Sequence, residues 1–526
     1  MDNIKKELER AELHRTIWSM ANDLRGSIDG WDFKQYVLGM LFYRYISENI
    51  TDYINARILK TEKTGIDYAG ISDEEAEKIR EDVTKAKGFF ILPGELFKNV
   101  CTSAKDDINL NITLQRIFKN IEFSASGRES ESNLKGLFDD LDVNSNKLGN
   151  TVAQRNEKLA RLLHSVAAMK LGDYKDNTID AFGDAYEYLI SMYASNAGKS
   201  GGEYYTPQEV SELLTRLTLV GKTEVNKVYD PACGSGSLLL KFAKILGKEN
   251  VHKGFFGQEL NLTTYNLCRI NMILHDIEFN KFHIALGDTL TDPCYWDGEL
   301  FEAIVSNPPY SIKWKGDSDP HLTNDPRYSP AGVLAPKSKA DLAFIMHSLY
   351  LLSENGAAAI VCFPGVLYRS GTEKKIRKYL VDNNFIDCII QLPENLFFGT
   401  SIATCIMVLK KSKSENKTLF IDASKEFVKV TNNNKLTKEN IDKILNSYMD
   451  KTDIKHFSRL VSNSEIARQD YNMSVSLYVE QEDPKERFDI SDLNTEIESI
   501  VSRQQFLREE IGKIINEIEE CMKKSL

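Results

Sequence analysis

A short glycine-rich turn is the first segment of this sequence whose residue types suit chemistry. An apolar run ends at Asp230, and Pro-Ala-Cys-Gly-Ser-Gly-Ser follows it. The small residues Ser235, Gly236 and Ser237 let the backbone approach a bound ligand closely. The turn matches neither of the two common pyrophosphate loops, G-x-G-x-x-G and G-x-x-x-x-G-K-[ST]. A tight strand-to-helix turn that binds nothing is the alternative.

Two acidic residues follow the next two apolar runs. Glu259 ends the second run, 23 residues beyond Gly236, a separation that suits binding of ribose hydroxyls. Asp288 follows the third run, where its carboxylate can accept a hydrogen bond from an adenine amino group. A ribosyl-adenine ligand without a pyrophosphate indicates S-adenosyl-L-methionine, which we predict as the cofactor.

The segment Asn307-Pro-Pro-Tyr310 follows the fourth apolar run. Two consecutive prolines cannot continue a central strand, so the chain leaves the sheet there in a rigid extended turn. The restricted backbone fixes the Asn307 amide and the Pro308 carbonyl, which are two acceptors for the two hydrogens of an exocyclic amine. Holding both hydrogens localises the nitrogen lone pair toward a methyl sulfonium, while Tyr310 offers a face for stacking. A proline-rich loop that merely follows a buried strand is the alternative.

An α/β fold is needed to bring these segments together. Short apolar runs alternate with helical patterns, which predicts a doubly wound, mainly parallel sheet. The carboxyl ends of its strands lie at one edge, where ligands bind. The predicted strands are residues 227–229, 254–257, 283–286, 303–305, 357–362, 386–391 and 404–409.

The chain divides into three predicted parts. Residues 1–170 have helical periodicity and predict an all-helical domain, residues 171–476 hold the alternating pattern of a catalytic domain, and residues 477–526 form a helical tail. Apolar residues recur in heptads from Ile490 to Cys521, which predicts a coiled-coil-like helix that binds a partner. A helix that docks back on its own chain is the alternative.

The composition limits the kinds of partner and compartment. The 526 residues carry 66 Lys+Arg against 77 Asp+Glu, a net charge of −11, so bulk charge alone does not grip nucleic acid. Nucleic acid as a substrate is still compatible with this balance. No apolar run is long enough to span a membrane, and the charged N-terminal segment is not a signal peptide. Eight cysteines without metal-binding spacing predict a cytoplasmic protein and no metal site.

The order of these segments resembles the DNA amino-methyltransferases that act on adenine N6. The resemblance rests on the Asp-Pro-Ala-Cys-Gly-Ser-Gly turn, Glu259, Asp288 and Asn-Pro-Pro-Tyr. A further segment, Glu203-Tyr-Tyr-Thr-Pro-Gln208, is similar to the additional cofactor segment of that branch. Over nearly the whole chain, the sequence most closely resembles the modification (M) subunit of type I restriction–modification systems.

The resemblance implies a site-specific adenine methyltransferase that uses S-adenosyl-L-methionine. It places Asn307, Pro308 and Tyr310 against an adenine flipped out of duplex DNA, with Pro309 setting the turn. It implies partners as well: a specificity (S) subunit that reads the sequence and binds the C-terminal helix, a restriction (R) subunit in the full complex, and a second copy of this chain. The implied cofactor contacts are Glu203, Tyr204, Tyr205, Thr206, Pro207, Gln208, Ser235, Gly236, Ser237 and Glu259, supported by Asp230 and Asp288.

A long predicted loop, residues 311–340, is a candidate DNA contact. Trp314 lies between two of its lysines, and a merely solvated loop is an equal alternative. Its basic residues are Lys313, Lys315, Arg327, Lys337 and Lys339, against three aspartates.

Other functions share part of the pattern. Asn-Pro-Pro-Tyr also occurs in methyltransferases of RNA and of protein glutamine, so the motif alone leaves the substrate class open. The helical N-terminal region, residues 203–208 and the tail favour a DNA modification subunit. Residues 410–489 show no basic cluster or base-reading motif, which favours recognition by a separate subunit. A non-catalytic scaffold is a further alternative, against which the intact Asn307 and Glu259 argue.

Overall fold

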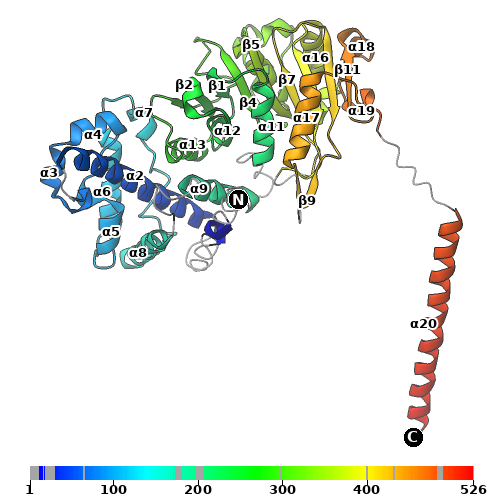
Figure 1. Ribbon diagram of the computed structural model, residues 1–526, viewed down its shortest axis with the longest axis horizontal. Coiled ribbons are helices and arrows are strands. Elements are labelled where there is room, and N and C mark those ends of the chain that lie inside the picture. The colour runs from blue at the N-terminus through cyan, green and yellow to red at the C-terminus, as the bar shows by residue number, and fades with distance from the viewer. Residues whose placement is uncertain are drawn as a thin grey trace. The chain divides into compact units, whose positions relative to one another are not determined.

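The computed structural model divides the chain into two compact units, Met1–Glu480 and Gln481–Leu526 (Figure 1). The residues that it describes are 11–15, 17, 30–62, 66–169, 171, 181–196, 206–296, 298–397, 401–430, 433–481 and 490–524.

A nine-stranded sheet organises the first unit, with the strand order β11-β8-β6-β7-β5-β4-β1-β2-β3. Strands β1 to β6 and β8 run parallel to one another, whereas β7 runs antiparallel to both β5 and β6, and β11 antiparallel to β8. The predicted mainly parallel sheet and its seven strands are therefore confirmed. The bounds are β1 Val225–Asp230, β2 Val251–Glu259, β3 Phe282–Leu286, β4 Phe301–Ser306, β5 Leu352–Cys362, β6 Ile386–Gln391, β7 Cys405–Leu409, β8 Lys417–Asp422 and β11 Ser458–Ser462.

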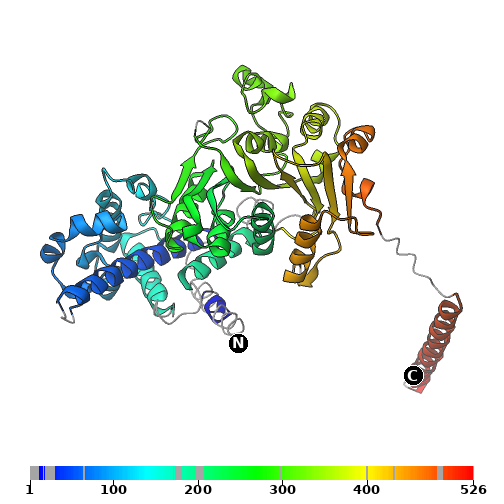
Figure 2. The ribbon, with the colours of Figure 1, turned by 45° about the horizontal axis from the view of Figure 1, so that its top comes forward.

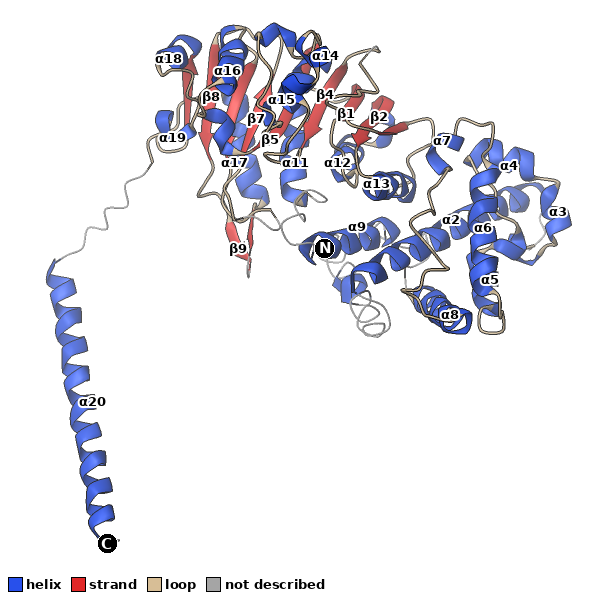
Figure 3. Cartoon of the chain, turned by 180° about the vertical axis from the view of Figure 1, so that it is seen from behind, coloured by secondary structure: helices blue, strands red, loops and turns tan. Residues whose placement is uncertain are grey.

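Helices cover both faces of this sheet (Figures 1 and 3). Strand β5 is buried continuously from Gly356 to Cys362, as expected of a central strand packed on both sides. Its alternate residues enter different apolar cores: Ala359 belongs to the core that includes buried residues of α11, α12, α13 and α17, and Ala358 to the core that includes those of α15, α16 and α19. These helices are α11 Gln208–Thr218, α12 Ser237–Leu246, α13 Leu262–Leu274, α15 Asp341–Leu351, α16 Thr372–Asp382, α17 Lys438–Asp450 and α19 Val475–Tyr478.

The predicted N-terminal helical region is confirmed and packs against the side of the sheet that carries α13 (Figure 2). Arg269 of α13, only 1% exposed, donates hydrogen bonds to the carbonyls of Ser132 and Lys135 at 3.0 Å each. A buried guanidinium that satisfies backbone carbonyls fixes this contact. The helices are α2 Gly30–Glu62, α3 Asp73–Glu77, α4 Arg80–Lys87, α5 Phe97–Ser103, α6 Leu110–Ser124, α7 Glu131–Leu134, α8 Val152–Ala168 and α9 Ala181–Asn196.

The second unit contains one long helix, α20 Ile490–Lys524. The predicted helix is confirmed, and its heptad residues are exposed to solvent: Ile497 by 55%, Ile500 by 60%, Leu507 by 53% and Ile514 by 54%. None of the described helices is long and apolar enough to cross a membrane.

Candidate active site

The carboxyl edge of β1, β2 and β4 brings the predicted polar residues together. Strand β2 runs beside β1 so that Asp230 pairs with Gly257, two residues before Glu259. The amide of Gly234, in the glycine turn, donates to Glu259 Oε2 at 3.0 Å, and the amide of Asn261 donates to Oε1 at 2.8 Å. Both carboxylate oxygens are thus oriented by backbone groups. Burial raises the pKa of Glu259.

Asp230 lies fully buried beneath the glycine turn. Its Oδ1 accepts hydrogen bonds from the Ala232 amide at 3.0 Å and from the Ser306 hydroxyl at 2.9 Å. Its Oδ2 is buried and accepts none from the residues that the structure describes. Burial raises the pKa of Asp230 to about 7, because a carboxylate removed from water is destabilised.

The glycine turn connects β1 to α12 as the sequence predicted. Gly236 has a φ of 79°, and a Cβ built on it would lie 2.7 Å from Cys268 Sγ on α13, so a larger residue would clash there. Ser235 and Ser237 are buried, and Asn271 donates to the Ser235 carbonyl at 3.0 Å. The turn is therefore held closely against α13.

Asp288 follows β3, in a loop that is hydrogen-bonded to the glycine turn. Its Oδ1 accepts from the Leu290 amide at 3.0 Å, and its Oδ2 accepts from the Thr291 hydroxyl at 2.8 Å. The loop is tied to the glycine turn by the Thr289 hydroxyl, which donates to the Pro231 carbonyl at 2.6 Å. Asp288 thus orients the loop beside the turn rather than standing apart from it.

Asn307 leaves β4 at the same edge and is 8% exposed. Its Nδ2 donates to the hydroxyl of Thr206 at 3.2 Å, and its Oδ1 accepts from the hydroxyl of Tyr310 at 2.5 Å. Burial raises the pKa of Tyr310 well above its usual range, so the phenol stays protonated and donates. The carboxamide therefore joins the segment before α11 to the turn after β4.

The end of the Asn-Pro-Pro-Tyr turn is also fixed. Ser311 has a φ of 52°, a left-handed conformation that is uncommon for a residue with a side chain. Its amide donates to both carboxylate oxygens of Asp341, each at 3.2 Å. Burial raises the pKa of Asp341. Asp341 was not among the predicted site residues.

Gln208 begins α11 and anchors the upstream segment. Its Nε2 donates to Glu187 Oε2 on α9 at 3.3 Å, and Lys244 of α12 donates to the other oxygen at 3.0 Å. Thr206 and Pro207 are buried beside the edge. The remaining predicted residues of this segment, Glu203, Tyr204 and Tyr205, lie outside the described residues.

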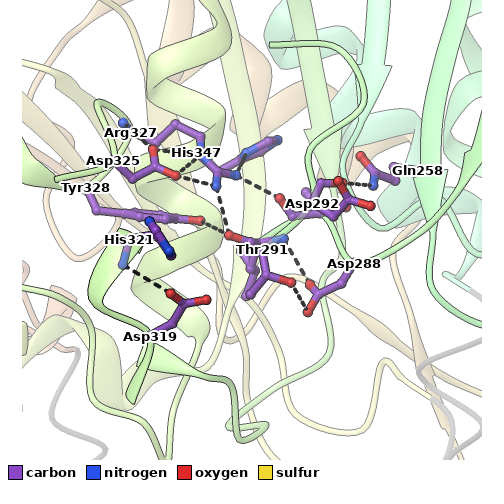
Figure 4. A network of polar contacts seen from close by, with 12 residues as sticks. Gln258, Asp288, Thr291, Asp292, Asp319, His321, Asp325, Arg327, Tyr328 and His347 are labelled. Carbon is purple, nitrogen blue, oxygen red and sulfur yellow. Dashed lines mark hydrogen bonds and ion pairs between the residues drawn. The ribbon is translucent and has the colours of Figure 1, made fainter. Parts of the chain in front are cut away.

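A buried network connects the long loop to the Asp288 loop (Figure 4). Arg327, 1% exposed, pairs with Asp325 at 2.6 Å and donates to the carbonyls of Thr289 and Leu290 at 2.8 and 2.9 Å. It also donates to His347 Nδ1 at 3.0 Å. Burial, followed by the Arg327 charge, keeps the pKa of His347 well below its usual range, so this histidine is neutral.

The prediction that the loop of residues 311–340 contacts DNA is wrong for Arg327, which is buried, whereas Trp314 is half-buried. Arg327 faces inward, and the Trp314 indole donates to the Pro336 carbonyl at 3.1 Å while packing edge-on against Tyr328. Lys337 forms an ion pair with Asp317 at 3.0 Å. Counting charges along a loop assumes that each faces solvent, which a buried arginine violates.

Sequence reasoning missed several residues that hold this edge together. Ser306 precedes the predicted Asn307 by one position, and its place at a strand end is the signal that was available. Glu187 and His347 lie on elements distant in sequence, where no motif points to them, and Arg327 was predicted only as a possible DNA contact.

The strand order, with antiparallel β7 between β5 and β6, is that of an α/β methyltransferase. The glycine turn after β1 and the acids after β2 and β3 belong to the same class of site. A family model described as N-6 DNA Methylase matches residues 177–487, and one described as HsdM N-terminal domain matches residues 13–166.

Relatives agree over almost the full length. The methylase subunit of the type I restriction enzyme MpnII from Mycoplasma pneumoniae is 49% identical over 98% of this chain and 97% of its own. The methylase subunit of MjaVII from Methanocaldococcus jannaschii is 31% identical over 98% of this chain and 85% of its own. A solved methyltransferase subunit of a type I system from Streptococcus thermophilus has a TM-score of 0.81 and 37% identity, covering 90% of this chain and 100% of that chain. The chain belongs to the N-6 DNA methylase family, among the methylase subunits of type I restriction enzymes.

Proposed function

We propose that this chain transfers a methyl group from S-adenosyl-L-methionine to N6 of an adenine flipped out of duplex DNA. The observation that carries the proposal is the buried Asn307 carboxamide at the carboxyl end of β4, directly after Ser306, which donates a hydrogen bond to Asp230 at the end of β1. The family model favours DNA adenine over RNA or protein glutamine as the substrate.

The residues at the edge fit an adenosyl ligand that carries positive charge. Glu259, oriented by two backbone amides, has further lone pairs for ribose hydroxyls. The unpartnered Oδ2 of Asp230 and the carboxylate of Asp288 add negative charge and acceptors. Gln208, Thr206 and the small residues of the glycine turn complete the proposed cofactor site. When bound, S-adenosyl-L-methionine supplies an electrophilic methyl group on a sulfonium.

The role of Asn307 is to prepare the amine for attack. Its Oδ1 and the carbonyl of Pro308 accept the two N6 hydrogens, which localises the nitrogen lone pair toward the methyl group. The N–CH₃ bond forms as the CH₃–S bond breaks, and the extra N6 proton leaves to water. Tyr310 stacks on the base, and Pro309 holds the turn rigid. The transfer needs no covalent enzyme intermediate, so Cys233 serves only in packing.

Base flipping follows from the location of Asn307 at the carboxyl edge of the sheet. An adenine stacked in a duplex cannot reach the edge of a sheet, so the base must leave the helix. The enzyme then needs contacts to DNA that an acidic chain supplies poorly by bulk charge, which favours dependence on a partner.

We propose that the partner is a specificity subunit that binds α20, because this helix carries a row of exposed apolar heptad residues. The full assembly includes a restriction subunit and a second copy of this chain, and it acts in the cytoplasm, where its DNA substrate lies. We further propose that the chain has three domains: residues 1–170, residues 171–476 and residues 477–526.

The direct test is Asn307→Ala in the assembled methyltransferase. We expect radioactive methyl transfer to duplex DNA to fall by at least about a hundredfold, as for loss of one preorganised polar group. We expect assembly to stay intact and binding of S-adenosyl-L-methionine to fall far less than methylation, since Asn307 reaches the cofactor segment only through its hydrogen bond to Thr206. Undiminished methylation would overturn the mechanism and favour a scaffold role.

A second measurement tests the division of labour. Methylation of duplex DNA is assayed with this chain alone and with the specificity subunit encoded beside it. Activity only in the presence of the partner supports the proposal, whereas full activity of the isolated chain contradicts dependence on a separate reading subunit.

A further inference from the structure

A small β-hairpin stands apart from the nine-stranded sheet. Among the strands that the structure describes, β9 Val428–Val430 and β10 Asn433–Lys435 pair with each other alone, and the hairpin projects past α17 (Figures 1 and 3). Phe427, Val428 and Val430 are exposed by 38%, 44% and 49%. An exposed apolar element without a core function needs another explanation.

The hairpin lies at the same edge as the candidate active site. It follows β8, whose last residue, Asp422, pairs with Gln391 at the end of β6. Gln391 pairs with Cys405 of β7, and Cys405 pairs with Cys362 at the end of β5. Strand β5 runs beside β4, whose end bears Asn307. The strand register therefore leads from the catalytic turn to the hairpin along one edge.

Direct contacts fix the hairpin at this edge. The amide of Asn434 donates to the Asn395 carbonyl at 2.9 Å, and its side chain donates to the Glu394 carbonyl at 2.8 Å, both in the loop after β6. Lys435 lies close enough to the start of α11 to act on Glu209: burial raises the pKa of Glu209, and the Lys435 charge partly opposes this. Glu209 directly follows Gln208 of the predicted cofactor segment.

The charge of the hairpin opposes that of the whole chain. Lys425, Lys429 and Lys435 are exposed, and the single acid among residues 425–435 is Glu426. Glu426 is already paired with Lys443 of α17 at 2.5 Å. Lys429 pairs across the hairpin with Asn434, and Lys435 with Val428, so the two lysines project from opposite faces. Within a chain of net charge −11, this is a local excess of free positive charge.

We propose that the β9–β10 hairpin is a DNA-binding element that contacts the phosphate backbone beside the target adenine. The inference rests on the proposed function, because it assigns a contact for the same substrate. Lysines on both faces neutralise phosphates, while the exposed valines suit the apolar surfaces of sugars and bases. Linear charge counting missed the element because its lysines are separated in sequence and belong to one short element only once the hairpin forms.

The test uses the methyltransferase assembled with its specificity subunit. Mapping of methylated adenines in DNA treated with the unaltered enzyme identifies the target, and the dissociation constant for a short duplex carrying it is measured over a range of salt concentrations. For Lys429→Gln or Lys435→Gln, we expect weaker binding and a salt slope reduced by about 0.9 for each lost phosphate contact. The matched control is Lys85→Gln, which replaces an exposed lysine on α4 and should change neither the dissociation constant nor the salt slope.

The results for the hairpin variants distinguish a DNA-binding role from the alternatives. Unchanged affinity and salt slope in both hairpin variants overturn the proposal, and so does loss of assembly with the specificity subunit, which would make the hairpin a protein interface. Unchanged binding of S-adenosyl-L-methionine shows that each variant is folded. If the unaltered assembly methylates no adenine, the proposed function fails, whereas methylation with unaffected hairpin variants rejects only the DNA-binding role of the hairpin.

Discussion

The Asn307 side chain donates a hydrogen bond to the Thr206 hydroxyl at 3.2 Å, although 101 positions separate the two residues. This contact joins the segment before α11, which we assign to cofactor binding, to the turn that holds the target base. Cofactor and base sites therefore share one hydrogen-bonded framework. A substitution of Thr206 should therefore affect the position of the Asn307 side chain even if no ligand contacts Thr206.

Replacement of Thr206 by valine tests this coupling. Valine keeps the shape but removes the acceptor, and a neutral hydrogen bond contributes about 1 kcal/mol. We expect single-turnover methylation to slow about fivefold. Thr206→Ser, which retains the hydroxyl, is the control and should stay near the unaltered rate. A valine variant as fast as the serine variant would show that Asn307 needs no support from Thr206.

The hydroxyl of Tyr310 suggests a second test, because it donates at 2.5 Å to the same Asn307 oxygen that we assign to the adenine amine. Because a carboxamide oxygen has two lone pairs, the incoming amine either shares this oxygen with the phenol or displaces it. Tyr310→Phe removes the competing donor and keeps the ring, so we expect methylation within about threefold of the unaltered enzyme. Tyr310→Ala removes stacking worth about 1–3 kcal/mol per base and should weaken productive binding about tenfold or more.

The readout is the rate of methylation against DNA concentration for both variants. Equal defects in the phenylalanine and alanine variants would mean that the hydroxyl, and not the ring, carries the function of Tyr310.

The strands and the order of the polar residues were predictable because apolar alternation and strand-end chemistry are local signals. The direction of β7 was not predictable, because Cys405–Leu409 is the same apolar run in a parallel strand as in an antiparallel one. The β9–β10 hairpin was missed because its strands are three residues each. Short polar strands lack the periodicity that marks longer ones.

The motif residues of the candidate site were predictable from the sequence, whereas the residues that hold them in place by hydrogen bonds were not. Asp230, Glu259 and Asn307 occupy strand ends, which a sequence pattern locates. Arg327 reaches the carbonyl of Leu290 across 37 residues, and such pairings arise only from the path of the folded chain. Its burial inside a loop that looked charged and exposed could not be inferred from composition.

The pKa of Asp230 predicts a pH dependence of stability. Burial raises this pKa to about 7, against about 3.9 in an unfolded chain. Between these two pKa values the folded state binds the proton more strongly than the unfolded state does. The contribution of Asp230 to the free energy of unfolding therefore falls as pH rises from about 4 to about 7, and it stays constant at higher pH.

The variant Asp230→Asn abolishes this titration. The melting temperature of the variant relative to the unaltered protein should therefore be higher at pH 8 than at pH 5, as measured by calorimetry at each pH. The same difference at both pH values would show that Asp230 does not titrate in this window.

The exposed apolar row of α20 predicts where the specificity subunit binds. Ile500 and Leu507 are 60% and 53% exposed and share one heptad position, so a partner helix would bury both. Each buried aliphatic side chain contributes about 1.5–3 kcal/mol. Ile500→Glu combined with Leu507→Glu should therefore weaken association with the specificity subunit about a hundredfold or more, as measured by isothermal calorimetry. Ser502→Glu changes the same helix outside the heptad positions and should bind like the unaltered chain. Equal affinities for all three proteins would place the specificity subunit elsewhere on the molecule.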